Sequence, residues 1–437
     1  MIMISHIRIK IVTAFTLILL MTVSCTSNQT KKQNQDTASK KDSYSISVKA
    51  GDYVNSKSNE AVKFTENSMG YVKVTKSGWL EYNVQIPETG RYKISLSGSA
   101  SDSSAVSCWI EDNVYNKDGR TYNITGNMMV KKASVSGTDN VVEKDGTPLV
   151  TGPHMMRLHY DTGNVAFSKI CFDLIRKHKS SPVVLTQKTT GKEWKLVWSD
   201  EFNGTGLPDT TKWTYDIGNW GWGNNELEYY TVNRLENARQ EDGNLIIESR
   251  KDDGIYPWSS ARLTTRGKES FLYGKIEFRA KVPAGRGTWS AGWLLGDEYK
   301  DELSWPYCGE IDVLENVGFE MEPKTGSGKT HASVHCGAYY FKLGNQPTSI
   351  IDVKNMTDEY HIYSIEWLSG SIAILIDGKK YFEYHDTSNN LTWPFSKPQN
   401  LILNLAMGGG WGGAKGMDPE MKSAKFILDY IRVYELN

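Results

Sequence analysis

The sequence predicts an all-β protein with two β-sandwich (jelly-roll) domains, and three observations lead to that fold class. Apolar and polar residues alternate with a period of two in many segments beyond residue 43, which is the pattern of strands with one buried face. Clusters of Gly, Ser, Asp and Asn separate these segments, as turns do. The N-terminal half shows no helical stretch of useful length, and 437 residues suffice for two or three buried cores.

The N-terminal 24 residues are typical of an export signal. His6, Arg8 and Lys10 precede an apolar run that is too short to favour a membrane span. "TVSC" then ends at Cys25, where a bacterial lipoprotein is cleaved and acylated, although Thr22 stands where Leu is usual. We therefore expect an exported protein anchored in a bacterial membrane by a lipid on Cys25, at the cell surface or facing the periplasm. An ordinary secretory signal is the alternative.

Composition divides the rest of the chain. Residues 25–43 are polar and should form a disordered tether, because nothing there can bury a core. A polar linker over 178–193, with Pro182, separates a first domain over 44–177 from a second over 194–437. The 50 basic and 51 acidic residues give a charge of −1, which excludes an electrostatic footprint for nucleic acid. We expect a monomer.

The first domain alternates most clearly in "WLEYNVQI", where Leu80, Tyr82, Val84 and Ile86 share one face. "SISVKAGDY", "GWLEYNVQIPETGRYKISLSGSA" and "GPHMMRLHY" make this domain resemble a family 6 carbohydrate-binding module. A spacer sandwich without a ligand is the alternative. By the resemblance, the aromatic residues that stack on glycan would be Trp79, Trp109, Tyr115 and Tyr122.

The second domain contains many strand-like segments, among them "KLVWSDEF", "NLIIESR", "YGKIEFRAKV", "HIYSIEWL", "LILNLAM" and "FILDYIRVYEL". "SIAILIDGKKYFEY" is typical of a hairpin, because the dipeptide Asp377-Gly378 accepts positive φ at both central positions of a tight turn. So many strands over about 240 residues predict one large sandwich.

Three carboxylates, Glu310, Asp312 and Glu315, stand at uneven spacing in "WPYCGEIDVLENVG". On a regular strand, Glu310 and Asp312 point the same way and Leu314 would follow them. One extra residue, a β-bulge, returns Glu315 to their face. A helix would not cluster the three acids. The spacing therefore predicts a bulged strand that aims three acids at one place.

Crowded carboxylates repel one another, and the repulsion can keep one of them protonated near neutral pH. Retaining glycoside hydrolysis needs such a pair, one ionised and one protonated, roughly 5–5.5 Å apart. A metal site in which His335 joins the acids is one alternative. A solvated strand face is another.

"GEIDVLE" matches the E-x-D-x-x-E signature of glycoside hydrolase family 16, and "WGWGNNELEYYT", "ARLTTRGKESFLYGKIEFRAKVP", "GTWSAGWLLG" and "LILNLAMGGGWGG" resemble its laminarinase branch. The resemblance spans residues 194 to 436 and implies a concanavalin-like sandwich with a concave glycan cleft. It implies Glu310 as nucleophile, Glu315 as acid/base, Asp312 as the residue that tunes their pKa, and His335 as an assisting cleft residue. A core histidine is the alternative for His335.

A sugar ring needs an aromatic platform with polar neighbours. Core packing is the alternative for the tryptophans, a surface ion pair for the arginine, and a simple turn for the Asn pair. The candidate substrate-binding residues are Trp220, Trp222, Trp289, Trp293, Trp411, Arg262, Asn224 and Glu226.

No cofactor is expected for catalysis. The family resemblance implies a structural calcium at positions matching Glu201, Gly243 and Asp429. An oxidising compartment permits two disulfides, Cys108–Cys171 and Cys308–Cys336, and free buried thiols are the alternative.

The resemblance implies a retaining endo-β-glucanase that cuts β-1,3-glucan of the laminarin type, and mixed-linkage β-1,3-1,4-glucan as a further substrate. One alternative is a glycan-capture protein without catalysis, but both glutamates are present. Another is the same fold acting on a marine galactan such as agar, porphyran or carrageenan. No distinct basic cluster beside the acids favours those substrates.

Overall fold

The computed structural model describes residues 44–57, 61–112, 122–135, 137–178, 193–252, 254 and 256–436. The expected export signal, the Cys25 lipid site, the tether, most of the linker, Tyr115 and the side chain of Tyr122 lie outside the described residues. The described part is all-β, as predicted, and none of its helices is long or apolar enough to cross a membrane. Its helices are single 3₁₀ turns: η1 (Ala50–Asp52), η2 (Gly318–Glu320) and η3 (Phe341–Leu343).

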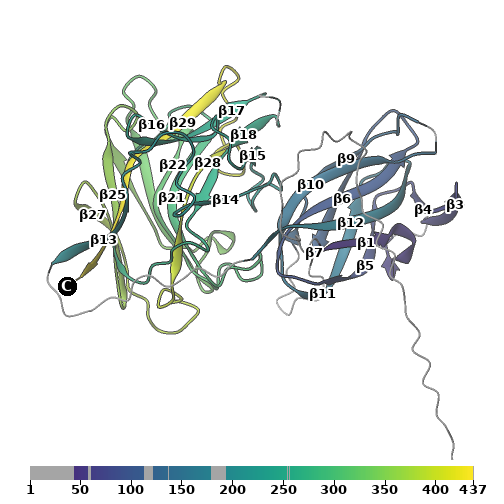
Figure 1. The fold of residues 1–437 in the computed structure, drawn as a ribbon, viewed down its shortest axis with the longest axis horizontal. Coiled ribbons are helices and arrows are strands. Elements are labelled where there is room, and N and C mark those ends of the chain that lie inside the picture. The colour runs from purple at the N-terminus through teal and green to yellow at the C-terminus, as the bar shows by residue number, and fades with distance from the viewer. Residues whose placement is uncertain are drawn as a thin grey trace, which may run out of the picture.

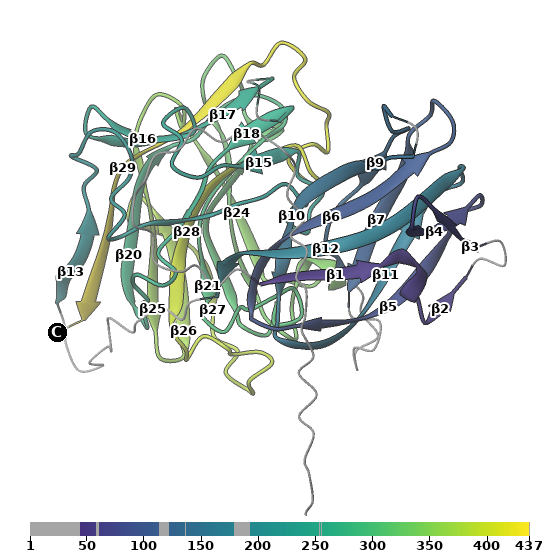
Figure 2. The same cartoon turned by 45° about the vertical axis from the view of Figure 1, so that its right-hand side comes forward.

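The first unit is a sandwich of two sheets packed face to face (Figures 1 and 2). One sheet has the order β10 (Asn140–Leu149), β6 (Gly90–Ala100), β12 (Val165–Lys177), β4 (Met69–Val74) and β3 (Val62–Glu66), with β1 (Ser45–Lys49) also paired to β12. The other has the order β2 (Asn55–Ser56), β5 (Gly78–Ile86), β11 (Gly152–Tyr160), β7 (Val106–Asp112) and β8 (Tyr122–Asn123), with β9 (Met128–Val130) paired to β7.

The core of this unit lies between the sheets and follows the predicted alternation. Leu80, Tyr82, Val84 and Ile86 of β5 are each at most 3% exposed. They belong to one apolar cluster with alternate residues of β6, such as Ile94.

The second unit is a larger sandwich of a ten-stranded and a seven-stranded sheet. The ten-stranded sheet has the order β15 (Glu228–Tyr230), β18 (Trp258–Ser260), β17 (Asn244–Lys251), β29 (Ser423–Leu436), β20 (Gly274–Lys281), β25 (His361–Leu368), β26 (Ser371–Ile376) and β27 (Lys379–Tyr384), with β13 (Trp194–Asp200) on β29 and β16 (Ala238–Glu241) on β17. The seven-stranded sheet has the order β14 (Thr214–Asp216), β19 (Arg262–Thr264), β28 (Gln399–Met407), β21 (Thr288–Gly296), β22 (Glu310–Val317), β23 (Gly328–His335) and β24 (Thr348–Val353).

The seven-stranded sheet has one face in the core and the other under a cleft. On β28, every residue is buried. Leu401, Leu403 and Leu405 belong to the main core cluster between the sheets, whereas Asn404 lines the cleft on the opposite face. A polar residue inside an apolar run therefore marks the functional face of this central strand.

The hairpin between β26 and β27 turns at Asp377 (φ 49°) and Gly378 (φ 77°). Both central residues have positive φ, as the Asp-Gly dipeptide predicts for a tight hairpin turn.

Neither of the two disulfides that the sequence permits is present, because Cys108, Cys308 and Cys336 carry free, buried thiols, as in the alternative. Cys108 on β7 belongs to the core cluster of the first unit. Cys171 on β12 pairs in register with Ser47 and lies outside that cluster, between the core residues Ile170 and Phe172. Its side chain therefore points to the opposite face of its sheet and cannot meet Cys108.

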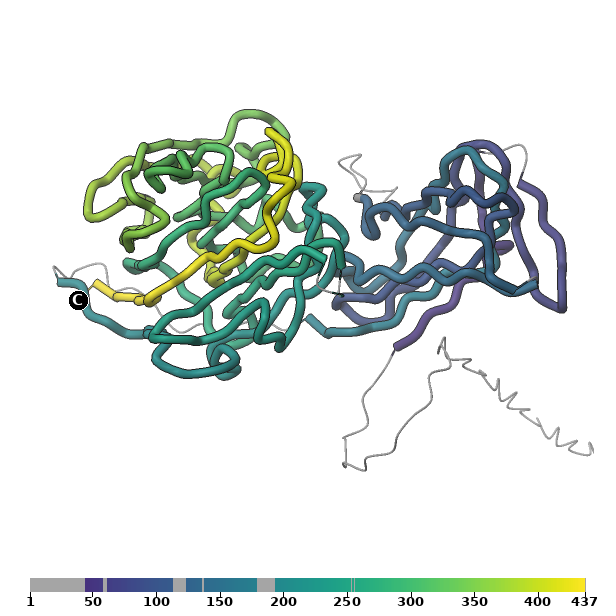
Figure 3. The backbone as a smooth tube through the Cα atoms, turned by 90° about the horizontal axis from the view of Figure 1, so that it is seen from above, coloured from purple at the N-terminus to yellow at the C-terminus, as the bar shows by residue number. Residues whose placement is uncertain are grey.

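The two units lie next to each other and meet at a junction in the middle of the molecule (Figure 3). The Tyr229 hydroxyl donates to the Asp145 carboxylate across the junction, and Lys144 Nζ lies 3.0 Å from the Tyr256 hydroxyl. Both contacts reach the same part of the second unit, at β15 and at the residues just before β18.

Candidate active site

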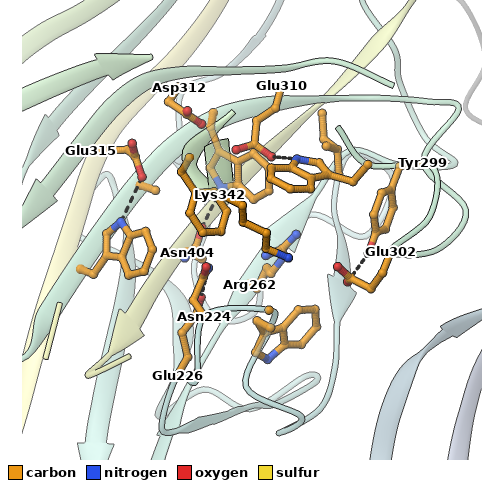
Figure 4. Close-up of a pocket in the computed structure, with 18 of the residues that line it drawn as sticks. Asn224, Glu226, Arg262, Tyr299, Glu302, Glu310, Asp312, Glu315, Lys342 and Asn404 are labelled. Carbon is orange, nitrogen blue, oxygen red and sulfur yellow. Dashed lines mark hydrogen bonds between the residues drawn. The ribbon is translucent and has the colours of Figure 1, made fainter. Parts of the chain in front are cut away.

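A cleft crosses the exposed face of the seven-stranded sheet and encloses about 790 Å³ of empty space, counted to its open mouth (Figure 4). Carboxylates, one arginine and one lysine face into it between large aromatic rings. The aromatic residues that line it are Trp220, Trp222, Trp289, Trp293, Tyr299, Trp305 and Phe341.

The three acids of β22 face this cleft together, and the backbone explains how. Along β22, Asp312 pairs with Ser333 and Glu315 with His331, so three steps on β22 match two steps on β23. The extra residue is a bulge, which is also visible in the pairing with β21. Val313 and Leu314 are fully buried in the core cluster, whereas Glu310, Asp312 and Glu315 all line the cleft.

Glu310 is held by an aromatic donor. The Trp305 indole N–H donates to Glu310 Oε2 at 2.9 Å. Burial, reinforced by the neighbouring charge of Asp312, raises the pKa of Glu310 to about 7, while His335, the Trp305 donor and Arg262 oppose the rise. Glu310 is therefore the carboxylate that ionises near neutral pH.

Glu315 has a matching partner at the other end of the group. The Trp289 indole N–H donates to Glu315 Oε1 at 3.1 Å. Burial and the negative charges of Asp312 and Glu310 raise the pKa of Glu315 well above its usual value, against the opposing effects of His335 and Trp289. Burial and the neighbouring charges therefore favour the protonated form of Glu315.

Asp312 lies between them, 3% exposed, and burial raises its pKa to about 8. His335 Nε2 lies 3.2 Å from Asp312 Oδ2 and 3.8 Å from Glu310 Oε1, without an aligned hydrogen bond to Oδ2. Ligand atoms of Glu310, Asp312 and His335 lie within 4.8 Å of one another, and no other such group of three occurs in the described part of the chain. The alternative of a metal site is therefore geometrically possible, but its ligands would include Glu310 and Asp312, which are two of the three cleft acids.

Arg262 is clamped between two rings of the cleft. Its guanidinium carbon lies 4.8 Å from the ring centres of both Trp222 and Trp293. Its Nε donates to the buried carboxylate of Asp216 at 3.2 Å. This stack fixes both tryptophans as flat platforms, and the backbone of Trp222 has a positive φ of 52°, a strained conformation that needs such support.

Asn224 and Glu226 lie together in the wall of the cleft. Asn224 Nδ2 donates to Glu226 Oε1 at 3.0 Å, and the Tyr230 hydroxyl donates to Oε2 at 3.2 Å. Burial and the charge of Glu226 hold the pKa of the adjacent Glu228 well above its usual value. The pair offers both an amide and a carboxylate to sugar hydroxyls.

The other predicted tryptophans take different places. Trp289 and Trp293 line the cleft from β21, and the Trp293 N–H donates to Asn404 Oδ1 at 2.8 Å. Trp411 is not among the lining residues and packs edge-on against Trp289, with ring centres 5.2 Å apart. Trp411 therefore supports Trp289 rather than facing the cleft.

Several cleft residues escaped the sequence analysis: Tyr299, Glu302, Trp305, Phe341, Lys342 and Asn404. Trp305 stands five residues before Glu310, and Asn404 interrupts an apolar strand, so both carried a signal. Phe341 and Lys342 belong to η3 far from β22 in sequence, and only the fold brings them to the cleft.

The residues expected to hold calcium do not fit such a site as they lie. Both oxygens of Glu201 accept from Arg432, at 3.0 and 2.8 Å. Asp429 is paired with Arg279. Each carboxylate is already neutralised by a guanidinium group, so neither has the unshared charge that Ca²⁺ requires.

Comparison with known proteins covers the second unit. Residues 225–431 match the sequence model of "Glycosyl hydrolases family 16". A beta-glucanase of Rhodothermus marinus is 46% identical over 252 residues, which is 55% of this chain and 85% of the relative. A glucan endo-1,3-beta-glucosidase A1 of Niallia circulans is 36% identical over 272 residues, 55% of this chain and 38% of the relative. The X-ray structure of the laminarinase from Rhodothermus marinus matches with a TM-score of 0.53 at 45% identity, covering 56% of this chain and 98% of that one.

The second unit is a β-sandwich with a carboxylate-lined cleft, and its match covers 85% of the Rhodothermus marinus beta-glucanase. Together these features define a glycoside hydrolase. The chain belongs to glycosyl hydrolases family 16. The predicted family of the second domain, the fold class and the enzyme class are therefore confirmed.

Proposed function

We propose that the protein is a retaining endo-β-1,3-glucanase that cuts glucan of the laminarin type and, as a further substrate, mixed-linkage β-1,3-1,4-glucan. The observation that carries this proposal is the bulge in β22, which turns Glu310 and Glu315 into one cleft of a family 16 hydrolase. The beta-glucanase and the glucan endo-1,3-beta-glucosidase A1, at 46% and 36% identity, support glucan over galactan. A keratan-sulfate endo-1,4-beta-galactosidase of Sphingobacterium multivorum is also 33% identical, over 271 residues, so the substrate panel below includes galactans.

Glu310 and Glu315 suit the two roles that the reaction needs. The Glu310 carboxylate, ionised near pH 7, attacks the anomeric carbon. Glu315, protonated at the same pH, gives its proton to the departing glycosidic oxygen. The C–O bond to the leaving sugar breaks as the bond to Glu310 forms, which leaves a covalent glycosyl-enzyme.

The second half of the reaction reverses the roles of the groups. Glu315, now ionised, takes a proton from water as the water oxygen attacks the same anomeric carbon. The bond to Glu310 breaks and the β configuration is restored. Asp312 and His335 lie beside both glutamates and influence their pKa values through charge. Trp222 and Trp293, fixed by Arg262, are the platforms for sugar rings.

The test is Glu310→Gln, assayed by reducing-sugar release from laminarin. We expect a loss of roughly a thousandfold or more, because the nucleophile is gone while the neutral amide keeps the shape. Glu298→Gln is the matched control, since Glu298 is an exposed partner of Lys397 in the same unit. Unchanged release in Glu310→Gln would contradict the assignment of Glu310 as the nucleophile.

A second experiment checks the substrate and the retention of configuration. The wild type is incubated with laminarin, mixed-linkage glucan, agarose and carrageenan, and NMR identifies the anomer that forms first. Binding without product from any of them would favour capture without cleavage.

We propose that the first unit is a glycan-binding module. Trp79, His159 and Trp109 pair side by side across β5, β11 and β7, and the rings of Trp109 and His159 stack with centres 5.1 Å apart. Aromatic groups gathered at one place on a sheet are the kind of side chain that a sugar-binding surface uses. Trp109→Ala should weaken retention on a laminarin affinity gel while leaving cleavage of short soluble oligosaccharides unchanged; equal retention would favour a spacer.

We also propose an exported lipoprotein that acts as a monomer, on the basis of the apolar N-terminal run and Cys25. Cys25→Ser should move the protein from the membrane fraction to the soluble exported fraction. Retention of the variant in the membrane fraction would contradict a lipid on Cys25.

A further inference from the structure

A second pocket lies at the junction of the two units, outside the cleft, and encloses about 370 Å³ of empty space counted to its mouth. Both units contribute to its wall. Its lining holds five basic side chains and a single acid: Arg91, Arg176 and Lys177 from the first unit, and Asp216, Arg266 and Lys300 from the second.

The acid cannot balance these charges. Asp216 is already shared by three arginines, with Arg262 Nε at 3.2 Å and Arg91 Nη2 and Arg176 Nη1 both at 3.6 Å. Lys177 has a partner of its own, since its Nζ lies 3.4 Å from Glu88. Arg91, Arg176, Arg266 and Lys300 thus face the pocket with at most one shared carboxylate among them.

Two of these arginines are buried with unused donors. Arg91 is 4% exposed and Arg266 8% exposed. Arg91 Nη1, Arg266 Nε and Arg266 Nη2 have no hydrogen-bond partner within the described ranges. A buried N–H donor left without an acceptor costs about 1–3 kcal/mol, and more on a charged group, so these donors point to an anionic acceptor in the pocket.

The sequence that follows the pocket adds no carboxylate to balance the positive charge. Residues 179–192, which follow the pocket residue His178, contain no Asp or Glu. His178 itself reports the excess of positive charge: burial and the charges of Arg266, Lys300 and Arg176 lower its pKa to about 4. His178 is therefore neutral at pH 7 and remains free to donate one ring N–H.

We propose that this pocket binds a multiply charged oxyanion, a sulfate or phosphate group, either as the free ion or as an ester carried by a glycan. Guanidinium forks match the oxygens of such groups in a two-pronged geometry. Because the donors come from both units, the bound anion ties them together. The site lies apart from the reacting acids, so it does not depend on the proposed hydrolysis.

The test is calorimetric titration of the full chain with sodium sulfate and with sodium phosphate, at ionic strength held constant with chloride to remove screening effects. We expect saturable one-to-one binding and a rise in the midpoint of thermal unfolding. Arg176→Gln and Lys300→Gln, both at partly open positions, should weaken binding roughly tenfold or more. Lys397→Gln, an exposed lysine of the same unit paired with Glu298, is the control and should bind as the wild type does.

A second titration distinguishes the sources, using sulfated and unsulfated laminarin oligosaccharides with the Glu310→Gln variant. If the sulfated oligosaccharide binds, if inorganic sulfate displaces it, and if Lys300→Gln weakens its binding, then the ligand of the pocket is a sulfate ester on a glycan. If only the inorganic ion binds, then the ligand is the free anion. The proposal is overturned if neither the inorganic ions nor the sulfated oligosaccharide bind saturably. It is also overturned if Arg176→Gln and Lys300→Gln bind as tightly as Lys397→Gln.

Discussion

Each of the two catalytic glutamates on β22 accepts a hydrogen bond from a different indole N–H group. Trp305 donates to Glu310 and Trp289 donates to Glu315, at 2.9 and 3.1 Å. Each donor favours the ionised form of its carboxylate and lowers that pKa. Because the two donors are chemically alike, each can be removed in turn to see which limb of the pH profile belongs to which glutamate.

Trp305→Phe should move the acidic limb of kcat/KM to higher pH by about one to two units. The lost hydrogen bond to a charged group is worth about 1.5–3 kcal/mol, and one pKa unit is about 1.4 kcal/mol. The pKa of Glu310 then rises from about 7, so the nucleophile is ionised only at higher pH. The measurement is the full pH profile of laminarin hydrolysis, in which kcat/KM reports groups of the free enzyme.

Trp289→Phe is the matched variant, and it should act on the other limb. Loss of its donor raises the pKa of Glu315, so the general acid stays protonated to higher pH and the basic limb moves up. If both variants shift the same limb, the assignment of nucleophile and acid to these glutamates is wrong.

At the scale of single elements, the alternation of residues along the strands predicts which side chains face the core and which face the cleft. The uneven spacing of Glu310, Asp312 and Glu315 predicted a bulge, and the register of β22 contains one. The same alternation, applied to Cys171 between Ile170 and Phe172, would have ruled out its bond to Cys108. Trp305 lies in the same motif but could not be recognised as a functional residue from the sequence. It lies in a loop, and a loop has no regular periodicity from which the direction of a side chain can be predicted.

The Asp377-Gly378 turn offers a test of backbone conformation alone. Gly378 has φ 77° and nothing lies within 4 Å of an added Cβ. Gly378→Ala should therefore lower the free energy of unfolding by about 1 kcal/mol through backbone strain, with no steric clash. Gly378→Asn should cost less, because Asn tolerates the left-handed region. Chemical denaturation of both variants is the measurement, and a loss for Gly378→Asn as large as that for Gly378→Ala would contradict the expected tolerance of Asn for the left-handed region.

At the scale of the molecule, the first unit supports the wall of the cleft. The Arg91 guanidinium carbon lies 4.7 Å from the ring centre of Trp222, and the guanidinium carbon of Arg262 from the second unit lies 4.8 Å from the same ring centre. Gly126 approaches the backbone of Trp220. Sequence patterns predicted each sandwich separately, but the two contacts just described join residues 131 and 94 positions apart, which local periodicity does not encode.

This contact predicts that Arg91→Met raises KM for long laminarin oligosaccharides several-fold while kcat changes little. A cation–π contact is worth about 0.5–2 kcal/mol, so the rise in KM should stay below about thirtyfold. kcat is spared because Trp222 contacts none of the three acids directly and acts only as a platform. The measurement is the KM and kcat of each variant in chloride buffer, which keeps sulfate and phosphate out of the junction pocket.

Arg157→Met is the matched control for that experiment. Arg157 also stacks on a tryptophan, at 4.2 Å from the ring centre of Trp79, within the same unit, but that pair is not in the cleft wall. Its KM for soluble oligosaccharides should equal that of the wild type. A rise in both variants would mean that the first unit acts on catalysis through its overall stability. A rise in Arg91→Met alone means that one arginine of the first unit holds a substrate platform of the second, so that the cleft is the product of both sandwiches.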